Sequence, residues 1–173
     1  MAGIYRKKNG EHIPFLKEEK IIGNLFFKSI NASKSIAQTR RDDIESIIYC
    51  LIYFYKGTLP WNKENVNMAF KYINRKLLRK KELTKKEKNS FFSKDDILFE
   101  IKNRISTKSL CEGMPTEFEL LLDYSRNLKF EEKPNYDLMK DLLKRVVLLD
   151  EIKCCSEGDF KFISIFKIIF CVF

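Results

Sequence analysis

One short stretch of this sequence is apolar around its whole circumference when it is drawn as a helix. It covers residues 42–56, and its apolar members are Ile44, Ile47, Ile48, Cys50, Leu51, Ile52, Phe54 and Tyr55. Asp42 or Asp43 can cap its start, and Gly57 follows where a helix would end. Because a helix that is apolar on every side is buried on every side, we expect this one to be the central helix of a globular domain.

Spaced apolar residues predict four more helices around the central one, at residues 63–81, 94–105, 115–127 and 136–149. Steps of three and four residues place their apolar side chains on one face, which we expect to turn toward the core. These side chains are Val66, Phe70, Ile73 and Leu77; Ile97, Ile101 and Ile105; Phe118, Leu121, Leu122 and Ser125; and Leu138, Met139, Leu142, Leu143, Val146 and Val147.

The chain of 173 residues is long enough for one domain with a real core. We expect a loop region at residues 1–31, a helical body at 32–150 and a divergent apolar tail at 151–173. Residues 160–173 are almost wholly apolar but fall short of the roughly 20 residues that span a bilayer as a helix. They are compatible with a strand, a membrane-touching segment or an aggregation-prone end.

The net charge of +9 favours acidic partners such as phosphoproteins, nucleic acid or anionic lipid. Because 24 acidic residues are mixed with 33 basic ones, a generally solvated basic surface explains the charge equally well. No apolar run opens the chain, so we expect no secretory signal and place the protein in the cytoplasm or nucleus.

The cysteines and the histidine do not suggest a metal site. No Cys-x-x-Cys pair occurs, and the single histidine, His12, lies far from every cysteine. The odd cysteine count fits a reducing compartment; the five are Cys50, Cys111, Cys154, Cys155 and Cys171. A lone loop histidine is also a poor general base unless an acid or a nucleophile lies beside it.

Several short motifs occur here in a fixed order. They are His12-Ile13-Pro14-Phe15, Ser29-Ile30-Asn31, Arg40-Arg41-Asp42-Asp43-Ile44-Glu45-Ser46, Gly57-Thr58-Leu59-Pro60-Trp61, Leu110-Cys111-Glu112-Gly113, Pro115-Thr116-Glu117-Phe118, and the stretch from Ser125 to Tyr136. Together they resemble the casein kinase I family of Ser/Thr protein kinases, from residue 12 to residue 147. The resemblance implies a mainly α fold, the C-terminal helical lobe of the protein kinase-like fold, with the N-terminal β lobe absent from this chain.

The resemblance also implies structural roles for three residues. Asp43 would be the buried aspartate that accepts backbone N–H bonds from a kinase catalytic loop, although a helix cap made by Asp42 or Asp43 would occupy the same place. Arg126 would brace the loop after the activation segment, or else be an ordinary surface arginine. Trp61 would belong to the structural core of the lobe.

By the same resemblance, the activation-segment and substrate side includes Gly23, Asn24, Ser29, Ile30 and Asn31. After the glycine the family shows Thr-Ala-Arg-Tyr-Ala, whereas this chain has Asn24-Leu25-Phe26-Phe27-Lys28. In the family the arginine helps to bind a phosphate on primed substrates. Phe26 cannot do so, and substrate recognition should therefore differ here.

Phosphoryl transfer depends on positioning and charge neutralisation. The chain contains no G-x-G-x-x-G and no His-Arg-Asp, and Met1-Ala2-Gly3-Ile4 stands where Asp-Phe-Gly-Leu would fall. We therefore expect no catalytic, ATP-binding or metal-binding residue and no activity from this chain alone, although ATP and magnesium would be the family's cofactors.

Two alternatives remain at this stage. The chain can be a fragment of a genuine active Ser/Thr kinase, truncated in the gene model. It can also be a basic helical module that binds nucleic acid or protein through residues 75–88. We expect proteins as partners, no membrane span, and no nucleic acid. Because the face that normally meets the other lobe would be open, we also expect marginal solubility.

Overall fold

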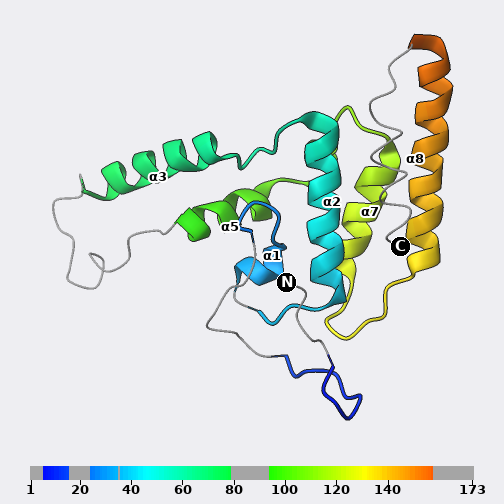
Figure 1. The fold of residues 1–173 in the computed structure, drawn as a ribbon. Coiled ribbons are helices and arrows are strands. Elements are labelled where there is room, and N and C mark those ends of the chain that lie inside the picture. Colours follow the sequence, from blue (N-terminus) through cyan, green and yellow to red (C-terminus); the bar gives the residue numbers. More distant parts are fainter. Residues whose placement is uncertain (1–5, 16–23, 35, 79–93, 158–173) are drawn as a thin grey trace.

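The computed structural model describes residues 6–15, 24–34, 36–78 and 94–157 (Figure 1). Over these ranges the chain is mainly α-helical, as predicted, and an isolated antiparallel bridge pairs Arg6 with His12. The helices are α1 (Ile30–Ser33), α2 (Arg40–Lys56), α3 (Lys63–Leu78), α5 (Lys94–Arg104), α6 (Thr107–Leu110), α7 (Thr116–Asn127) and α8 (Tyr136–Glu157).

Helix α2 is the central element, and its ends follow from local chemistry. The Asp42 carboxylate accepts a hydrogen bond from the Thr39 N–H at 2.9 Å, which satisfies a backbone donor just before the helix. Gly57 ends the helix in the left-handed region with φ 72°, where a side chain is disfavoured. The predicted helix at 42–56 is therefore confirmed, with a start two residues earlier.

The expectation that α2 is buried on every side is wrong. Tyr53 is 40% exposed and Phe54 is 50% exposed. Helices α1 and α7 pack along α2, and the side that carries Tyr53 and Phe54 is left partly open to solvent. Its buried apolar residues are Ile44, Ile48, Tyr49, Leu51 and Ile52.

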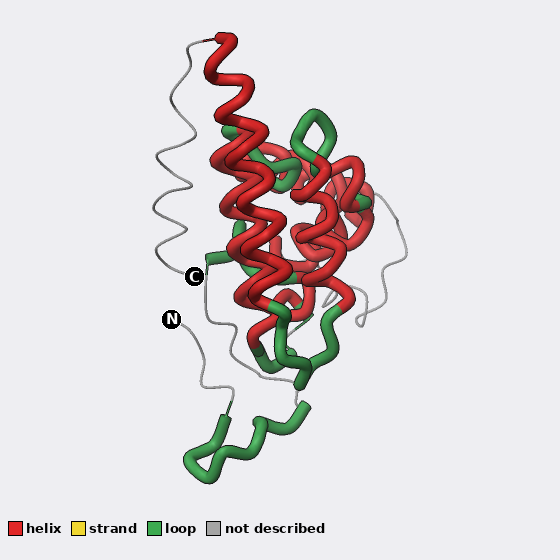
Figure 2. The backbone as a smooth tube through the Cα atoms, turned by 90° about the vertical axis from the view of Figure 1, so that its right-hand side faces the viewer, coloured by secondary structure: helices red, strands yellow, loops and turns green. Residues whose placement is uncertain are grey.

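The helices form one core in which α2, α7 and α8 lie side by side (Figures 1 and 2). Helix α3 packs on α5, and α5 in turn contacts α1. The predicted α7 stripe is confirmed, because all four of its residues are buried. In the α8 stripe Leu138 is an exception at 41% exposed, since it stands one residue before the buried Met139 and is rotated from it by about 100° around the helix.

The remaining differences concern helix lengths. Helix α8 continues to Glu157 and crosses the predicted boundary at 150–151 without a break. The short α6 was not predicted; it begins where the Ser106 hydroxyl accepts a hydrogen bond from the Ser109 N–H at 3.1 Å. Residues 79–81 and the apolar stretch 160–173 lie outside the described residues. None of the described helices is both long and apolar enough to cross a bilayer.

Candidate functional site

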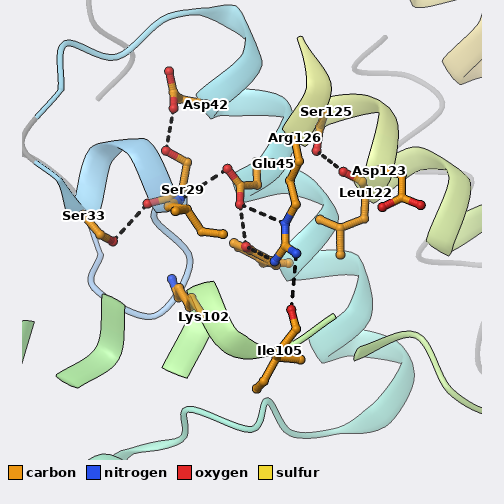
Figure 3. A network of polar contacts seen from close by, with 12 residues as sticks. Ser29, Ser33, Asp42, Glu45, Lys102, Ile105, Leu122, Asp123, Ser125 and Arg126 are labelled. Atoms are coloured by element: carbon orange, nitrogen blue, oxygen red, sulfur yellow. Dashed lines mark hydrogen bonds and ion pairs between the residues drawn. The ribbon is translucent and has the colours of Figure 1, made fainter. Parts of the chain in front are cut away.

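A buried polar contact joins the segment before α1 to the start of α2. The Ser29 hydroxyl donates to the Asp42 carboxylate at 2.6 Å and accepts from the Ala32 N–H at 3.0 Å (Figure 3). Ser29 and Asp42 are 1% and 2% exposed. One hydroxyl therefore caps α1 and ties it to the cap of α2, so the entry into both helices is fixed together.

The expected role of Asp43 as a buried aspartate is wrong for this structure. Asp43 is exposed, and Asp42 is the buried member of the pair. Successive helical residues are rotated by about 100°, so only one of two neighbours can turn back toward the helix start. The bond from the Asp42 carboxylate to the backbone before the helix selects that residue, and Asp43 points outward.

A second buried network links α2 to α7. The Tyr49 hydroxyl donates to the Glu45 carboxylate, and the Arg126 guanidinium donates to the Tyr49 hydroxyl at 3.1 Å. Nε of Arg126 also lies 3.6 Å from Oε1 of Glu45. The Glu45 side chain is 3% exposed and that of Arg126 is 19% exposed, so this ion pair is largely shielded from water.

The electrostatics of this network are set mainly by burial. Burial raises the pKa of Glu45, while the bond from Tyr49, the charge of Arg126 and the Ile30 N–H oppose the rise. Burial and the neighbouring Glu45 carboxylate raise the pKa of Tyr49 well above 10.0, so its hydroxyl remains a donor. Glu45 consequently accepts from Tyr49 and from the Ile30 N–H, the latter at 3.3 Å.

Arg126 lies in the interior of this site, and the alternative of an ordinary surface arginine is wrong. It also donates to the Ile105 carbonyl at 3.4 Å, in the link between α5 and α6. It reaches the segment that contains Ile30 only through Glu45, so any bracing of that segment is indirect. The side chains converge from α2 and α7 on one point (Figure 3).

Lys102 was not singled out by the sequence, yet its side chain is completely buried. Its ammonium group donates to three carbonyls, those of Leu25 at 3.3 Å, Phe26 at 2.9 Å and Lys28 at 2.7 Å. The same group lies 5.0 Å from the ring centroid of Tyr49 and 4.9 Å from that of Trp61. Contacts of this kind between an ammonium group and the face of an aromatic ring favour the charged form of the lysine.

Desolvation competes with these contacts. Burial lowers the pKa of Lys102 from 10.5 to about 7, with Glu45 opposing the decrease and Lys28 and Arg126 adding to it. The residue therefore titrates close to neutral pH. A signal was present in the sequence, because Lys102 lies four residues after the buried Leu98 and directly after Ile101 on the same helix.

Trp61 lies in the core of the described helices. It is fully buried, and its indole N–H donates to the Phe26 carbonyl at 2.8 Å. The Phe26 carbonyl therefore accepts from both Trp61 and Lys102, which fixes the backbone of the turn that carries it. The ring of Trp61 also meets that of Tyr49 edge to face at 5.0 Å.

The turn before Ser29 is closed by Asn24. Its side-chain oxygen accepts from the Phe26 N–H at 3.0 Å, and its carbonyl accepts from the N–H groups of Phe27 and Lys28 at 3.2 and 3.0 Å. The Asn31 carbonyl accepts from the Ile36 N–H at 3.2 Å, so Asn31 closes the turn after α1. Gly23 lies outside the described residues.

Beside this turn lies a cavity of about 390 Å³, which we call the aromatic pocket. It is lined by Phe26, Phe27, Tyr53, Gly57, Thr58, Leu59, Asn62 and Lys63. The rings of Phe27 and Tyr53 meet edge to face at 5.7 Å, and Leu59 is buried at 2%. Among the described residues the lining is mainly apolar, and Lys63 is the charged residue in it.

Two other potentially reactive side chains of the described ranges, His12 and Cys111, have packing contacts or burial that fit a structural role. The His12 ring packs edge-on against Phe130 at 5.0 Å, and its Nδ1 donates to the Ile13 carbonyl at 2.8 Å. Burial raises the pKa of the Cys111 thiol to about 11, so it is not a nucleophile at neutral pH. Within the described part of the chain, no group of three or more His, Cys, Asp or Glu residues is arranged to hold a metal ion.

The fold and these contacts define a small helical module in which a loop segment is fixed to a central helix by buried polar groups. No family model matches the chain. The resemblance to the casein kinase I family therefore rests on the sequence motifs.

Proposed function

We propose that this chain is a protein-binding module that resembles the C-terminal lobe of the casein kinase I family and does not transfer phosphate by itself. The observation that carries the proposal is the buried linkage of three separate motifs. Ser29 contacts Asp42, Ile30 contacts Glu45, and Glu45 contacts Arg126. These residues come from the Ser-Ile-Asn motif, the motif at the start of α2 and the motif that begins at Ser125.

The lack of catalysis is argued from the motifs. Phosphoryl transfer needs a phosphate cradle, magnesium ligands and a group that orients the attacking hydroxyl. The 173 residues contain neither a glycine-rich loop motif nor a His-Arg-Asp motif. The charged groups of the described network also face the interior, where Lys102 and Arg126 contact backbone carbonyls.

A role in protein binding is favoured by the surface. The aromatic pocket is lined by Phe26, Phe27 and Tyr53, and Tyr53 is 40% exposed. Aromatic residues that line an open cavity are typical of recognition surfaces, because aromatic side chains bury a large area with little loss of conformational freedom.

The test uses the purified full chain with Mg-ATP. A nucleotide at a hundredfold excess over its dissociation constant would stabilise the folded state by about 2.7 kcal/mol. For a chain of this size that corresponds to a rise in melting temperature of roughly 5–10 °C. We expect no rise and no labelling of casein by radioactive ATP. A clear rise in melting temperature or incorporated phosphate would refute the proposal, and a casein kinase I catalytic domain serves as the positive control.

A further inference from the structure

We propose that the aromatic pocket binds an aromatic side chain of an extended peptide, and that an acidic residue next to it in the peptide contacts Lys63. This inference names a ligand for the proposed binding module and so rests on that proposal. The choice of an aromatic ligand follows from the residues that line the pocket. Three aromatic residues, Phe26, Phe27 and Tyr53, surround a cavity of about 390 Å³, a size that accommodates a single large side chain.

The walls of the pocket are fixed before any ligand arrives. Two buried donors hold the Phe26 carbonyl, Trp61 at 2.8 Å and Lys102 at 2.9 Å, and Lys102 also holds the carbonyls on either side of the Phe26–Phe27 pair. On the opposite side, Gly57 ends α2 and leads directly into the Thr58–Leu59 wall. A preformed site loses little conformational entropy when it is filled.

The charge at the pocket indicates which neighbouring residue the peptide should carry. Lys63 is exposed, lines the pocket and is the first residue of the sixteen-residue helix α3. The Asn62 side chain accepts from the Asn65 N–H at 2.8 Å and so occupies one donor of that helix start. The positive end of the helix and the lysine both favour a carboxylate over an ammonium group at the pocket, whose lining includes Lys63 but not the neighbouring Glu64.

The experiment is an NMR titration of the ¹⁵N-labelled full chain with three peptides that differ at one position each. The first is acetyl-Ser-Gly-Phe-Glu-Gly-Ser-amide; the second replaces Phe by Ala, and the third replaces Glu by Lys. We expect the first peptide to shift the amide signals of Thr58, Leu59 and Asn62. The Ala peptide should bind about tenfold or more weakly, because it loses the buried ring. The Lys peptide should bind about two- to fivefold more weakly.

Two matched variants locate the site. Tyr53→Ala removes one wall, whereas Phe54→Ala removes an exposed ring that does not line the pocket. We expect Tyr53→Ala to weaken binding about fivefold or more and Phe54→Ala to change it by less than about twofold. Lys63→Glu lies on the surface and should reverse the preference, so that the Lys peptide binds more tightly than the Glu peptide.

The inference is overturned if the Ala peptide binds as well as the Phe peptide, if Tyr53→Ala and Phe54→Ala behave alike, or if the shifts map away from the pocket. It is also overturned if the same signals shift with protein concentration alone, because a second copy of the chain would then occupy the pocket. The titration contains no nucleotide, so its failure is distinct from the Mg-ATP binding that would refute the proposed function.

Discussion

Replacing Arg126 by methionine tests whether the Glu45–Tyr49–Arg126 network stabilises the fold. Methionine keeps the unbranched apolar stem of the arginine but lacks the guanidinium group, so the Glu45 carboxylate, 3% exposed, loses the opposite charge of Arg126. Removing one member of a buried pair costs roughly 3–5 kcal/mol. The Arg126 side chain is 19% exposed, which admits some water, so we expect the lower end of that range, about 3 kcal/mol.

The assay is equilibrium unfolding in urea followed by tryptophan fluorescence, since Trp61 is the only tryptophan and is fully buried. With a slope of about 2 kcal/mol per molar urea, the expected loss lowers the midpoint by about 1.5 M. The matched control is Arg104→Met on α5, whose ion pair with Glu100 is exposed on both sides at 80% and 44%. That variant should lose no more than about 0.5 kcal/mol.

The reasoning is refuted if Arg126→Met and Arg104→Met unfold within about 0.5 kcal/mol of each other. A double-mutant cycle with Glu45→Gln separates charge from packing. If the pair interacts as the 3.6 Å contact indicates, the two substitutions together should cost less than the sum of their separate costs by about 1 kcal/mol or more. Strict additivity would instead assign the loss to packing alone.

Three further predictions use the same unfolding assay. Asp42→Ala should destabilise the chain by about 2–3 kcal/mol because it removes a buried cap, whereas Asp43→Ala should stay within about 0.5 kcal/mol; equal costs would contradict the assignment. The pKa of Lys102 falls from 10.5 to about 7 on folding, so between these pH values the unfolded chain binds one proton more than the folded chain. The stability of the wild type relative to Lys102→Met should therefore rise with pH by up to about 1.4 kcal/mol per pH unit, and a flat difference between pH 6 and 9 would contradict this expectation. Gly57→Ala should cost about 1 kcal/mol, since φ 72° disfavours a Cβ although no atom lies within 4 Å of one; an unchanged midpoint would count against that strain.

Helix positions could be predicted from the sequence because apolar periodicity is a local property. The α7 stripe is the clearest case, since Phe118, Leu121, Leu122 and Ser125 all turned out to be buried. Apolar periodicity does not indicate which other element a helix face will pack against. Tyr53 and Phe54 were predicted to be buried because the sequence alone does not say which side of α2 the other elements leave open to solvent.

The polar part of the site was much harder to predict. Lys102 and Glu45 are charged residues, which are usually exposed, and partners distant in sequence are needed to compensate for their burial. Those partners are the carbonyls of the turn at residues 25–28 for Lys102 and the Arg126 guanidinium for Glu45. The burial of Asp42 likewise involves a contact with Ser29, which lies 13 residues earlier in the chain.

Tyr49 connects the two halves of the site. Its ring faces the Lys102 ammonium and the Trp61 indole, which together hold the turn that lines the aromatic pocket. Its hydroxyl belongs to the network of Glu45 and Arg126, which joins α2 to α7. Because packed interiors transmit strain, we expect a change in the Glu45–Arg126 contact to reach the pocket wall through the Tyr49 side chain. The charged residues of the interior therefore do more than stabilise the fold: they fix the shape of the surface that we propose binds a peptide.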